Sequence, residues 1–147
     1  MITNGGLVPG GILSEALGIT HVLTASVYFP DEVDQKLAWP TFIQFPSDTL
    51  LSNRRILIVD DICDGGATFV GLAKELRAAG AKKVYLYVTH GIFSKGLPLE
   101  GIDKVFTTDS YFNPESCSRP GTVPYCFDDA RRDGHLSVIP VSMKDLK

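Results

Sequence analysis

The chain has 147 residues, of which 44% are hydrophobic and 21% charged, and this length suits one globular domain with a single core. Lys and Arg number 14 against 17 Asp and Glu, so the net charge is −3 and gives no electrostatic basis for binding nucleic acid or a membrane surface. The strongly apolar run at 84–88 is far shorter than the roughly 20 residues that cross a bilayer, and no signal-peptide pattern opens the chain. We therefore expect one cytoplasmic domain spanning residues 1–147, with neither a nucleic-acid nor a membrane partner.

The cysteines indicate a reduced protein. Cys63, Cys117 and Cys126 are odd in number, include no C-x-x-C pair and have no secretory context in which a disulfide framework would form. A zinc site built from Cys117, Cys126 and His135 is not expected, because the spacing fits no common ligand pattern and a fourth ligand is not evident.

The first predicted element is a turn that leads into a short helix. Residues 4–18 begin with Asn-Gly-Gly, continue with an apolar pattern that starts at Pro9, and end at Gly18, a residue type that often stops a helix. The segment before this turn, residues 1–3, is shorter than the usual strand of about five residues. We therefore expect the N-terminal edge of the sheet to be cut short.

Two extended segments and a turn are predicted between this helix and the middle of the chain. Residues 21–29 are rich in β-branched and aromatic side chains and predict a strand, which Pro30 ends in an exposed loop. Residues 41–45 predict a short extended segment, and residues 47–53 predict a turn. The apolar run at 55–59 is typical of a buried parallel strand and forms the expected centre of the sheet.

A strand-helix-strand unit is predicted next. After Asp60 and Asp61 we expect a loop at 62–67, a helix at 68–79 with apolar side chains at helical spacing, and a buried strand at 83–88. Strands joined in this way are parallel, with a right-handed crossover. The unit indicates an α/β fold with a mostly parallel sheet flanked by helices.

The last third of the chain is predicted to hold less regular structure. Short strands are expected at 105–107 and 136–141. Residues 113–134 contain three prolines and are expected to be mostly loop.

The loop after the central strand carries the strongest chemical signal. In open α/β sheets, ligands bind at the carboxyl edge of the strands. Gly65 and Gly66 allow a tight turn that brings several backbone N–H groups towards one anion, the helix N-terminus adds partial positive charge, and Thr68 adds a hydroxyl donor. The segment Asp64 to Thr68, which includes Ala67, is therefore predicted to bind a terminal phosphate.

Adjacent carboxylates precede this loop. Asp60 and Asp61 would repel one another and a phosphate unless they accept hydrogen bonds from sugar hydroxyls or bind a divalent cation. Both partners occur in a phosphorylated ribose. The alternative is a solvated loop in which Asp64 caps the following helix. A response-regulator receiver domain, which also begins with paired acidic residues, is disfavoured because a third aspartate is missing after the strand at 84–88.

These residues resemble a known signature. The run V-D-D-I-C-D-G-G-A-T is similar to the phosphoribosyl diphosphate motif of type I phosphoribosyltransferases. The resemblance implies that family's fold, with Asp60 and Asp61 on the ribose hydroxyls and the loop from Asp64 to Thr68 on the 5′-phosphate. It places Asp64 near the nucleobase as the catalytic residue. It also implies Mg²⁺, held mainly by the substrate's diphosphate and ribose oxygens and by Asp60 and Asp61 at most indirectly.

The start of the chain resembles the same family. The run T-N-G-G-L-V-P-G-G-I-L-S-E-A-L-G-I-T-H-V is similar to the diphosphate loop and first helix of xanthine-guanine phosphoribosyltransferases. The resemblance implies that Thr3, Asn4, Gly5 and Gly6 cradle the diphosphate. That family commonly has an arginine or lysine in place of Asn4, so one charge-assisted contact is absent. On its own, this run is also compatible with a plain glycine turn.

A third segment resembles a different branch of the family. Residues 87–96, Y-V-T-H-G-I-F-S-K-G, are similar to ribose-phosphate diphosphokinases, the enzymes that make phosphoribosyl diphosphate. In 6-oxopurine transferases a lysine near this point reads the purine, and His90 takes its place here. Tyr111 or Phe112 stands where an aromatic ring stacks on the purine. The alternatives are that His90 only ends a strand and that both rings pack in the core.

Two remaining segments have expected roles at the site. The polar segment Pro30 to Trp39, which contains Lys36, is the expected closing loop, with an ordinary hairpin loop as the alternative. Residues 113–147 are expected to form a hood over the base or a tail.

The sequence therefore predicts a magnesium-dependent phosphoribosyltransferase. Its partners would be phosphoribosyl diphosphate and a nucleobase, with a purine favoured and diphosphate released, and we expect a homo-oligomer. The alternatives are a ribose-phosphate diphosphokinase-like domain and a non-catalytic regulator that binds phosphoribosyl diphosphate or a nucleotide.

Overall fold

The computed structural model describes residues 1–28, 41–111 and 131–139. Lys36, Phe112, Cys117 and Cys126 therefore lie outside the described residues, as do the predicted closing loop and most of the predicted hood. None of the helices in the described ranges has the length and apolar composition needed to cross a membrane.

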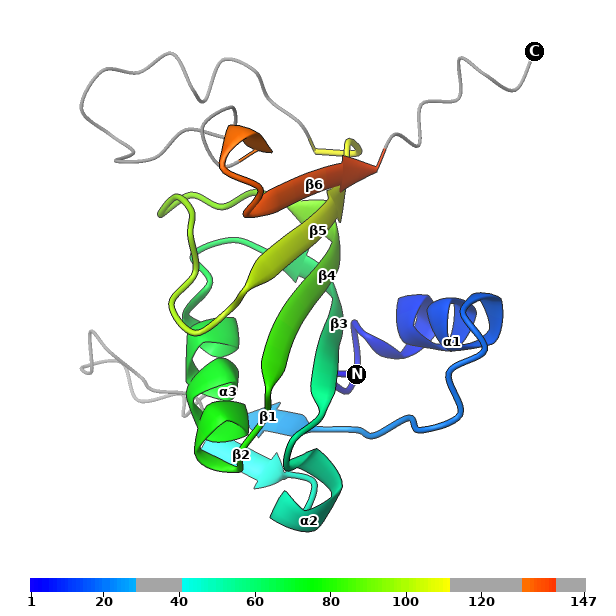
Figure 1. The fold of residues 1–147 in the computed structure, drawn as a ribbon. Helices are drawn as coiled ribbons and strands as arrows, with labels where there is room; N and C mark the ends of the chain where they lie inside the picture. The colour runs from blue at the N-terminus through cyan, green and yellow to red at the C-terminus, as the bar shows by residue number, and fades with distance from the viewer. Residues whose placement is uncertain (29–40, 112–130, 140–147) are drawn as a thin grey trace.

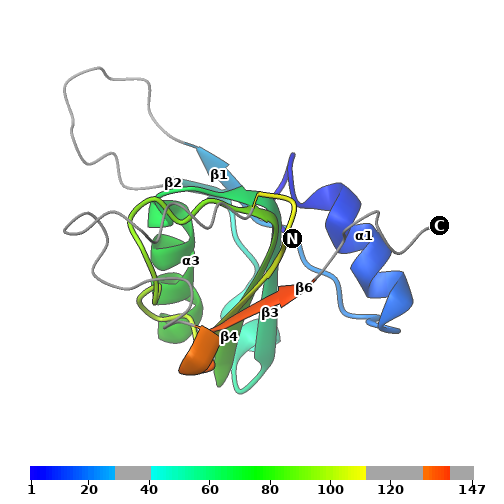
Figure 2. The same cartoon turned by 90° about the horizontal axis from the view of Figure 1, so that it is seen from above.

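A parallel four-stranded sheet forms the centre of the molecule (Figure 1). Its strands pair in chain order and are β3 (Arg55–Cys63), β4 (Lys83–Gly91), β5 (Lys104–Thr108) and β6 (Leu136–Ile139). Two helices, α3 (Ala67–Ala78) and α1 (Leu7–Ala16), lie on opposite sides of this sheet (Figure 2). The predicted α/β class and mostly parallel sheet are thus confirmed.

A smaller antiparallel pair accompanies the main sheet. β1 (Ser26–Tyr28) pairs with β2 (Thr41–Gln44), and the short helix α2 (Asp48–Leu51) leads directly into β3. This pair lies near the amino ends of the central strands, away from the edge where the predicted phosphate loop emerges (Figure 1).

The core lies between α3 and the sheet. Phe69, Leu72 and Leu76 of α3 are almost completely buried, and β4 contributes side chains that are fully removed from solvent: Val84, Leu86 and Val88. Each such side chain stabilises the fold by about 1.5–3 kcal/mol through burial alone. Buried side chains alternate along β4 and recur at helical spacing along α3. Both elements next to the loop between β3 and α3 are therefore firmly packed in the core.

The central strands run further than predicted. β3 continues through Asp60 and Asp61 to Cys63, and β4 continues to Gly91, so that Ile62 pairs with His90. Each strand supplies hydrogen-bond partners for the other, so both continue past their apolar runs. The polar residues at these strand ends hide the extension from a prediction based on composition. The predicted loop at 62–67 is therefore wrong at both ends, since α3 begins at Ala67.

Two other predictions need correction. Among the described residues, the strand predicted at 21–29 is regular over Ser26–Tyr28, because residues 21–24 pair with no described strand and Ala25 makes a single bridge to Ile2. The turn predicted at 47–53 contains one turn of helix, α2. At the sheet edge, Ile2 donates its backbone N–H to the Val59 carbonyl at 3.1 Å.

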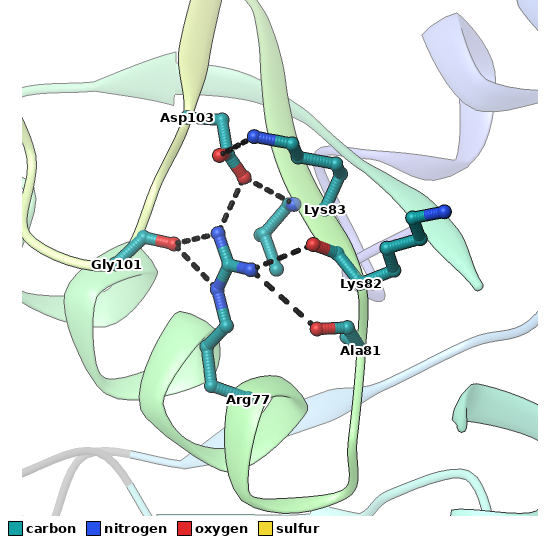
Figure 3. Close-up of polar contacts among 7 residues, drawn as sticks. Arg77, Ala81, Lys82, Lys83, Gly101 and Asp103 are labelled. Carbon is teal, nitrogen blue, oxygen red and sulfur yellow. Dashed lines mark hydrogen bonds and ion pairs between the residues drawn. The ribbon is translucent and has the colours of Figure 1, made fainter. Parts of the chain in front are cut away.

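An ionic cluster ties α3 to the amino ends of β4 and β5 (Figure 3). The Arg77 guanidinium donates to Asp103 and to the carbonyl oxygens of Gly101 and Lys82. Asp103 also accepts from Lys83 Nζ at 2.8 Å and from the Val84 backbone N–H at 2.8 Å. Burial alone would raise the pKa of the Asp103 carboxyl, but these donors outweigh burial and hold the pKa below its usual value.

We expect Asp103→Ala to lower the free energy of unfolding at pH 7 by on the order of 2 kcal/mol, because Arg77 and Lys83 lose their shared acceptor. The difference from wild type should begin to shrink below about pH 4 and should be lost as the pH falls through the lowered pKa of Asp103, because such a carboxylate stabilises the fold only while it is ionised. Urea denaturation at pH 7 and pH 3 measures both effects. Glu100→Ala, which breaks the exposed pair with Lys74, is the matched control. An equal loss in both variants would contradict the prediction.

Candidate functional site

The candidate site lies at the carboxyl edge of β3, where the chain turns into α3. The connection consists of Asp64, Gly65 and Gly66, and Gly66 is the N-cap of the helix with a φ of +76°. This left-handed conformation favours glycine. Gly66, not Asp64, occupies the cap, so the alternative in which Asp64 caps the helix is wrong. The first N–H groups of α3, among them those of Ala67 and Thr68, carry the partial positive charge of the helix dipole.

Both glycines of this connection are in close contact with the segment after β4. A Cβ atom at Gly66 would lie 2.6 Å from Leu99 Cδ2, and one at Gly65 would lie 3.3 Å from Lys95 Cε. Gly66 is therefore required both by its backbone conformation and by the lack of space beside Leu99. The connection is enclosed on one side by residues that follow β4.

The structure brings the N-terminal turn to the two adjacent carboxylates. A Cβ atom at Gly5 would lie 2.1 Å from Asp61 Oδ1 and 2.6 Å from Asp60 Oδ1, so the backbone at Gly5 lies directly against both side chains. Asn4 has a φ of +75°, and the Thr3 backbone N–H donates to the Ala25 carbonyl at 2.9 Å. Residues far apart in sequence thus meet at one edge of the sheet.

Backbone atoms of β3 and of the N-terminal segment leave no space for a side chain at Gly6. A Cβ atom at Gly6 would lie 2.2 Å from the Val59 carbonyl oxygen and 2.7 Å from that of Ile2. These are backbone atoms, which cannot rotate away. The turn therefore approaches β3 as closely as the chain allows.

Asp60 is under electrostatic strain at this position. Its half-buried carboxylate accepts the Asp61 backbone N–H at 2.9 Å. Burial raises the pKa of Asp60 to about 6; the hydrogen bond from Asp61 opposes this increase, and the Asp61 charge adds to it. A proton, a cation or a hydroxyl donor would each relieve this strain.

We expect Asp60→Asn to become progressively more stable than wild type as the pH rises from 4 to 7.5 in magnesium-free buffer. A carboxyl whose pKa is raised by folding destabilises the native state once it ionises, whereas the amide retains the acceptor oxygen and carries no charge. The gain should reach about 1 kcal/mol, allowing for the solvent exposure of the group. Thermal unfolding across this pH range measures it, with exposed Asp64→Asn as the control. A pH-independent difference would refute the prediction.

Cys63 is the last residue of β3, and its side chain packs in the core. Its side chain is only 1% exposed, and burial, followed by the charges of Asp64 and Asp60, raises the pKa of its thiol to about 12. Its carbonyl accepts the backbone N–H groups of Ile92 at 2.8 Å and Phe93 at 3.2 Å. The thiol is thus free, as predicted for this cysteine, and protonated at neutral pH.

His90 is oriented by a network of hydroxyl groups. Its Nδ1 lies 2.7 Å from Ser110 Oγ, which is 2.7 Å from Thr108 Oγ1 and 2.9 Å from the Thr89 carbonyl oxygen. Thr108 Oγ1 also donates to that carbonyl, at 2.5 Å. The alternative in which His90 only ends a strand does not account for these hydrogen bonds.

The number of protons in the network selects a tautomer. Thr108 donates its hydroxyl proton to the Thr89 carbonyl oxygen. The Thr89 carbonyl and the Thr108 hydroxyl oxygen can then only accept from Ser110, so Ser110 donates its single hydroxyl proton to one of them. His90 then satisfies its contact only by donating from Nδ1. In the neutral ring, Nε2 is consequently the acceptor.

The aromatic prediction is tested at one of its two residues. Tyr111 is 56% exposed, so the alternative in which this ring packs in the core is wrong. It directly follows Ser110, the residue that holds His90.

Sequence reasoning missed two residues of this edge, Lys95 and Ser110. Both depend on contacts between segments distant in sequence, which no local pattern reports. Lys95 lies in the segment 87–96 that resembles ribose-phosphate diphosphokinases, and this resemblance is the one sequence signal that points to it.

In the described residues, neither a group of metal-binding side chains nor the cavity beneath α1 marks this edge. Across the described ranges, no group of three or more His, Cys, Asp or Glu side chains is arranged to hold a metal ion. A cavity of about 660 Å³ lies elsewhere, beneath α1 and the amino half of β3, with walls that include Leu13, Phe45 and Leu76. The carboxylates of Asp60, Asp61 and Asp64 lie at the carboxyl edge and do not line this cavity.

Comparison with known proteins identifies the family to which this chain belongs. The phosphoribosyl transferase domain model matches residues 2–121. A ribose-phosphate pyrophosphokinase from Thermococcus kodakarensis is 32% identical over 118 residues, which cover 78% of this chain and 40% of that protein. A second such protein, from Mycoplasmopsis pulmonis, is 44% identical over 69 residues, covering 44% of this chain and 22% of that protein. The chain thus spans less than half the length of these two curated relatives.

Solved structures show the same fold. A purine phosphoribosyltransferase from Pyrococcus horikoshii aligns with a TM-score of 0.50 and 17% identity, covering 95% of this chain and 72% of that one. A phosphoribosylpyrophosphate synthetase from Mycobacterium smegmatis aligns with a TM-score of 0.51 and 22% identity, covering 90% of this chain and 37% of that one. With the parallel sheet and the loop between β3 and α3, these matches establish that the chain belongs to the phosphoribosyl transferase domain family and has the type I phosphoribosyltransferase fold.

Proposed function

We propose that this domain catalyses magnesium-dependent transfer of the phosphoribosyl group of phosphoribosyl diphosphate to a nucleobase, with a purine favoured and diphosphate released. The observation that carries the proposal is the meeting of three features at one sheet edge: the turn at Gly5, the carboxylates of Asp60 and Asp61, and the open N-terminus of α3. Together they can hold the diphosphate, the ribose and the 5′-phosphate of one substrate.

Each part of the substrate has a proposed partner. The backbone N–H groups from Asp64 to Thr68 and the Thr68 hydroxyl would hold the 5′-phosphate. The segment from Thr3 to Gly6 would hold the diphosphate. Asp60 and Asp61 would accept hydrogen bonds from the ribose hydroxyls, which would relieve the strain on the half-buried Asp60 carboxylate.

The residues present fit a magnesium ion that is shared with the substrate. Carboxylate oxygens suit Mg²⁺, which usually keeps few protein ligands and binds substrate phosphates, and the pair Asp60 and Asp61 offers such oxygens at Gly5. When bound, the ion would neutralise charge that develops on the departing diphosphate.

The base would lie beyond the ribose, near His90 and Tyr111. Nε2 of the neutral imidazole is an acceptor, so it suits an N–H on a purine edge, and the exposed Tyr111 ring can stack on the base. Asp64 is the proposed catalytic carboxylate and would accept the proton that the attacking base nitrogen loses. Lys36 and Phe112 remain proposed contributors to the closing loop and the stacking site.

The chemical step would depend mainly on positioning. Displacement at an oxocarbenium-like anomeric carbon needs the diphosphate, ribose and base held in line more than it needs a strong nucleophile on the protein. The rigid supports of the site, α3 on one side and the extended β3–β4 pair on the other, suit this role.

The decisive experiment incubates the purified protein with magnesium, phosphoribosyl diphosphate and a panel of purine and pyrimidine bases while diphosphate release is followed. Release that depends on a purine supports the proposal. Turnover with pyrimidines alone would overturn the choice of base. Binding of phosphoribosyl diphosphate without release for any base would instead favour a regulator.

A second candidate deserves a parallel assay because curated relatives are named ribose-phosphate pyrophosphokinases. The protein is incubated with ATP, magnesium and ribose 5-phosphate, and formation of phosphoribosyl diphosphate is measured. Synthesis here, without base-dependent release of diphosphate, would replace the transferase proposal. The cytoplasmic location and the homo-oligomer expected from the sequence stay predictions.

A further inference from the structure

Lys95 lies across the glycine turn that precedes α3. A Cβ atom placed on Gly65 would be 3.3 Å from Lys95 Cε, 3.4 Å from Cδ and 3.7 Å from Nζ. The end of the lysine side chain therefore passes beside the backbone of Gly65, and its ammonium group lies next to the turn. Any residue other than glycine at position 65 would push against this side chain.

The backbone around Lys95 is firmly anchored. Phe93 is 3% exposed and Leu97 is 5% exposed, so the residues on both sides of Lys95 are held in the core. The Gly96 backbone N–H donates to the Phe93 carbonyl at 2.8 Å, which closes a tight turn, and the Phe93 N–H donates to the Cys63 carbonyl. This turn is thus attached to the residue that immediately precedes the predicted phosphate loop.

A phosphate bound at the carboxyl edge of β3 would lie among acidic side chains, so a cationic side chain nearby would favour its binding. Asp60, Asp61 and Asp64 are all acidic, and a bound phosphate monoester would add up to two negative charges, whereas the helix N-terminus offers only about half a positive charge. Within the described parts of the chain, ion pairs join Lys74, Arg77 and Lys83 to acidic partners. Lys95 is in none of them, so its exposed ammonium is available to a ligand.

We propose that Lys95 donates a charge-assisted hydrogen bond to the phosphate monoester bound by the loop from Asp64 to Thr68. This inference rests on the proposed function, because it uses the same anion site and adds a residue to it. Lys95 would favour phosphorylated over unphosphorylated sugars and offset the repulsion between the phosphate and the neighbouring carboxylates.

The test titrates ribose 5-phosphate into wild type, Lys95→Met and Lys95→Arg, with the amide NMR signals of Gly65, Gly66 and Thr68 as the readout. Methionine retains an unbranched side chain against Gly65 but removes the charge. We expect Lys95→Met to bind about five- to tenfold more weakly, a range set by a partly exposed charged contact. Lys95→Arg should stay within about twofold of wild type because it keeps a cationic donor.

Lys82→Met is the matched control. Lys82 is also exposed, but it lies at the amino end of β4, and its side chain points away from the ionic cluster (Figure 3). This variant loses the same charge from the protein as Lys95→Met and should bind ribose 5-phosphate like wild type. An equal weakening in both variants would mean a general charge effect and would overturn the proposal.

The outcomes separate this inference from the proposed function. If wild type shows no shifts at the loop, the anion site itself is wrong. If wild type binds there and Lys95→Met binds equally well, the site stands and the role of Lys95 is wrong. The difference between wild type and Lys95→Met should shrink as salt is raised, since charge interactions are screened; a difference unchanged in 1 M salt would indicate packing and overturn the proposal. Thermal unfolding verifies that each variant is folded, and Lys95→Gln serves as a second neutral variant.

Discussion

Replacing both Asp60 and Asp61 by asparagine is expected to weaken the binding of phosphoribosyl diphosphate by about a hundredfold in the presence of magnesium. Each carboxylate would lose a charge-assisted hydrogen bond or a share of the metal interaction, and such contacts contribute about 1.5 kcal/mol or more each. The fold should remain intact, because the Asp61 N–H can still donate to the amide oxygen at position 60, and the repulsion between the two charges is removed.

Isothermal titration calorimetry measures this affinity directly. The control is Glu15→Gln combined with Glu75→Gln, which removes two exposed carboxylates from α1 and α3 and thus changes the net charge by the same amount. The control should bind like wild type. Equal affinity in the Asp60 and Asp61 double variant would remove the ribose and magnesium roles from this pair.

Gly6→Ala is expected to cause the largest loss of stability among single substitutions in the N-terminal turn. The new methyl group would meet the Val59 and Ile2 carbonyl oxygens at 2.2 and 2.7 Å, and the turn could accept it only by moving away from β3. Overpacking against backbone costs about 3 kcal/mol. The same movement would separate Gly5 from Asp60 and Asp61, so binding of the substrate should fall with stability.

Gly11→Ala provides a sharp comparison. Gly11 lies within α1, and a Cβ atom there would meet nothing within 4 Å, so the substitution should stabilise the helix by up to about 1 kcal/mol. Urea denaturation gives the two midpoints, which should move in opposite directions from wild type. If Gly6→Ala unfolds at the wild-type midpoint, the close approach of the turn to β3 is not real.

The unit from β3 to β4 could be predicted because its signals are local. The apolar run at 55–59, the helical spacing after Thr68 and the run at 84–88 each identify an element without knowledge of its neighbours, and short connections leave one arrangement for two parallel strands. A turn at Gly65 and Gly66 was predictable for the same reason, since both residues are adjacent in sequence to the strand and the helix that position them.

The ends of the strands and the contacts of Lys95 and Ser110 depend on pairing and packing between segments that are distant in sequence. The extension of β3 to Cys63 comes from hydrogen bonds with β4, and Asp60 and Asp61 by composition would suggest a loop. Residues 21–24 have strand-forming side chains but pair with no strand in the described parts of the chain. The contacts of Lys95 with Gly65 and of Ser110 with His90 link separate elements, so spacing along the chain does not reveal them.

The burial of Cys63 makes the opening of the loop between β3 and α3 measurable. Its protonated thiol is sealed under the connection between β3 and α3, so a thiol-labelling reagent can react only in molecules where this region has opened. In a variant with Cys117 and Cys126 replaced by serine, the labelling rate divided by the rate for an unstructured peptide gives the population of that open state. A ligand that fastens the loop must slow labelling in proportion to its occupancy. The cysteine can thus report on the motion of the loop without any probe being attached to the loop itself.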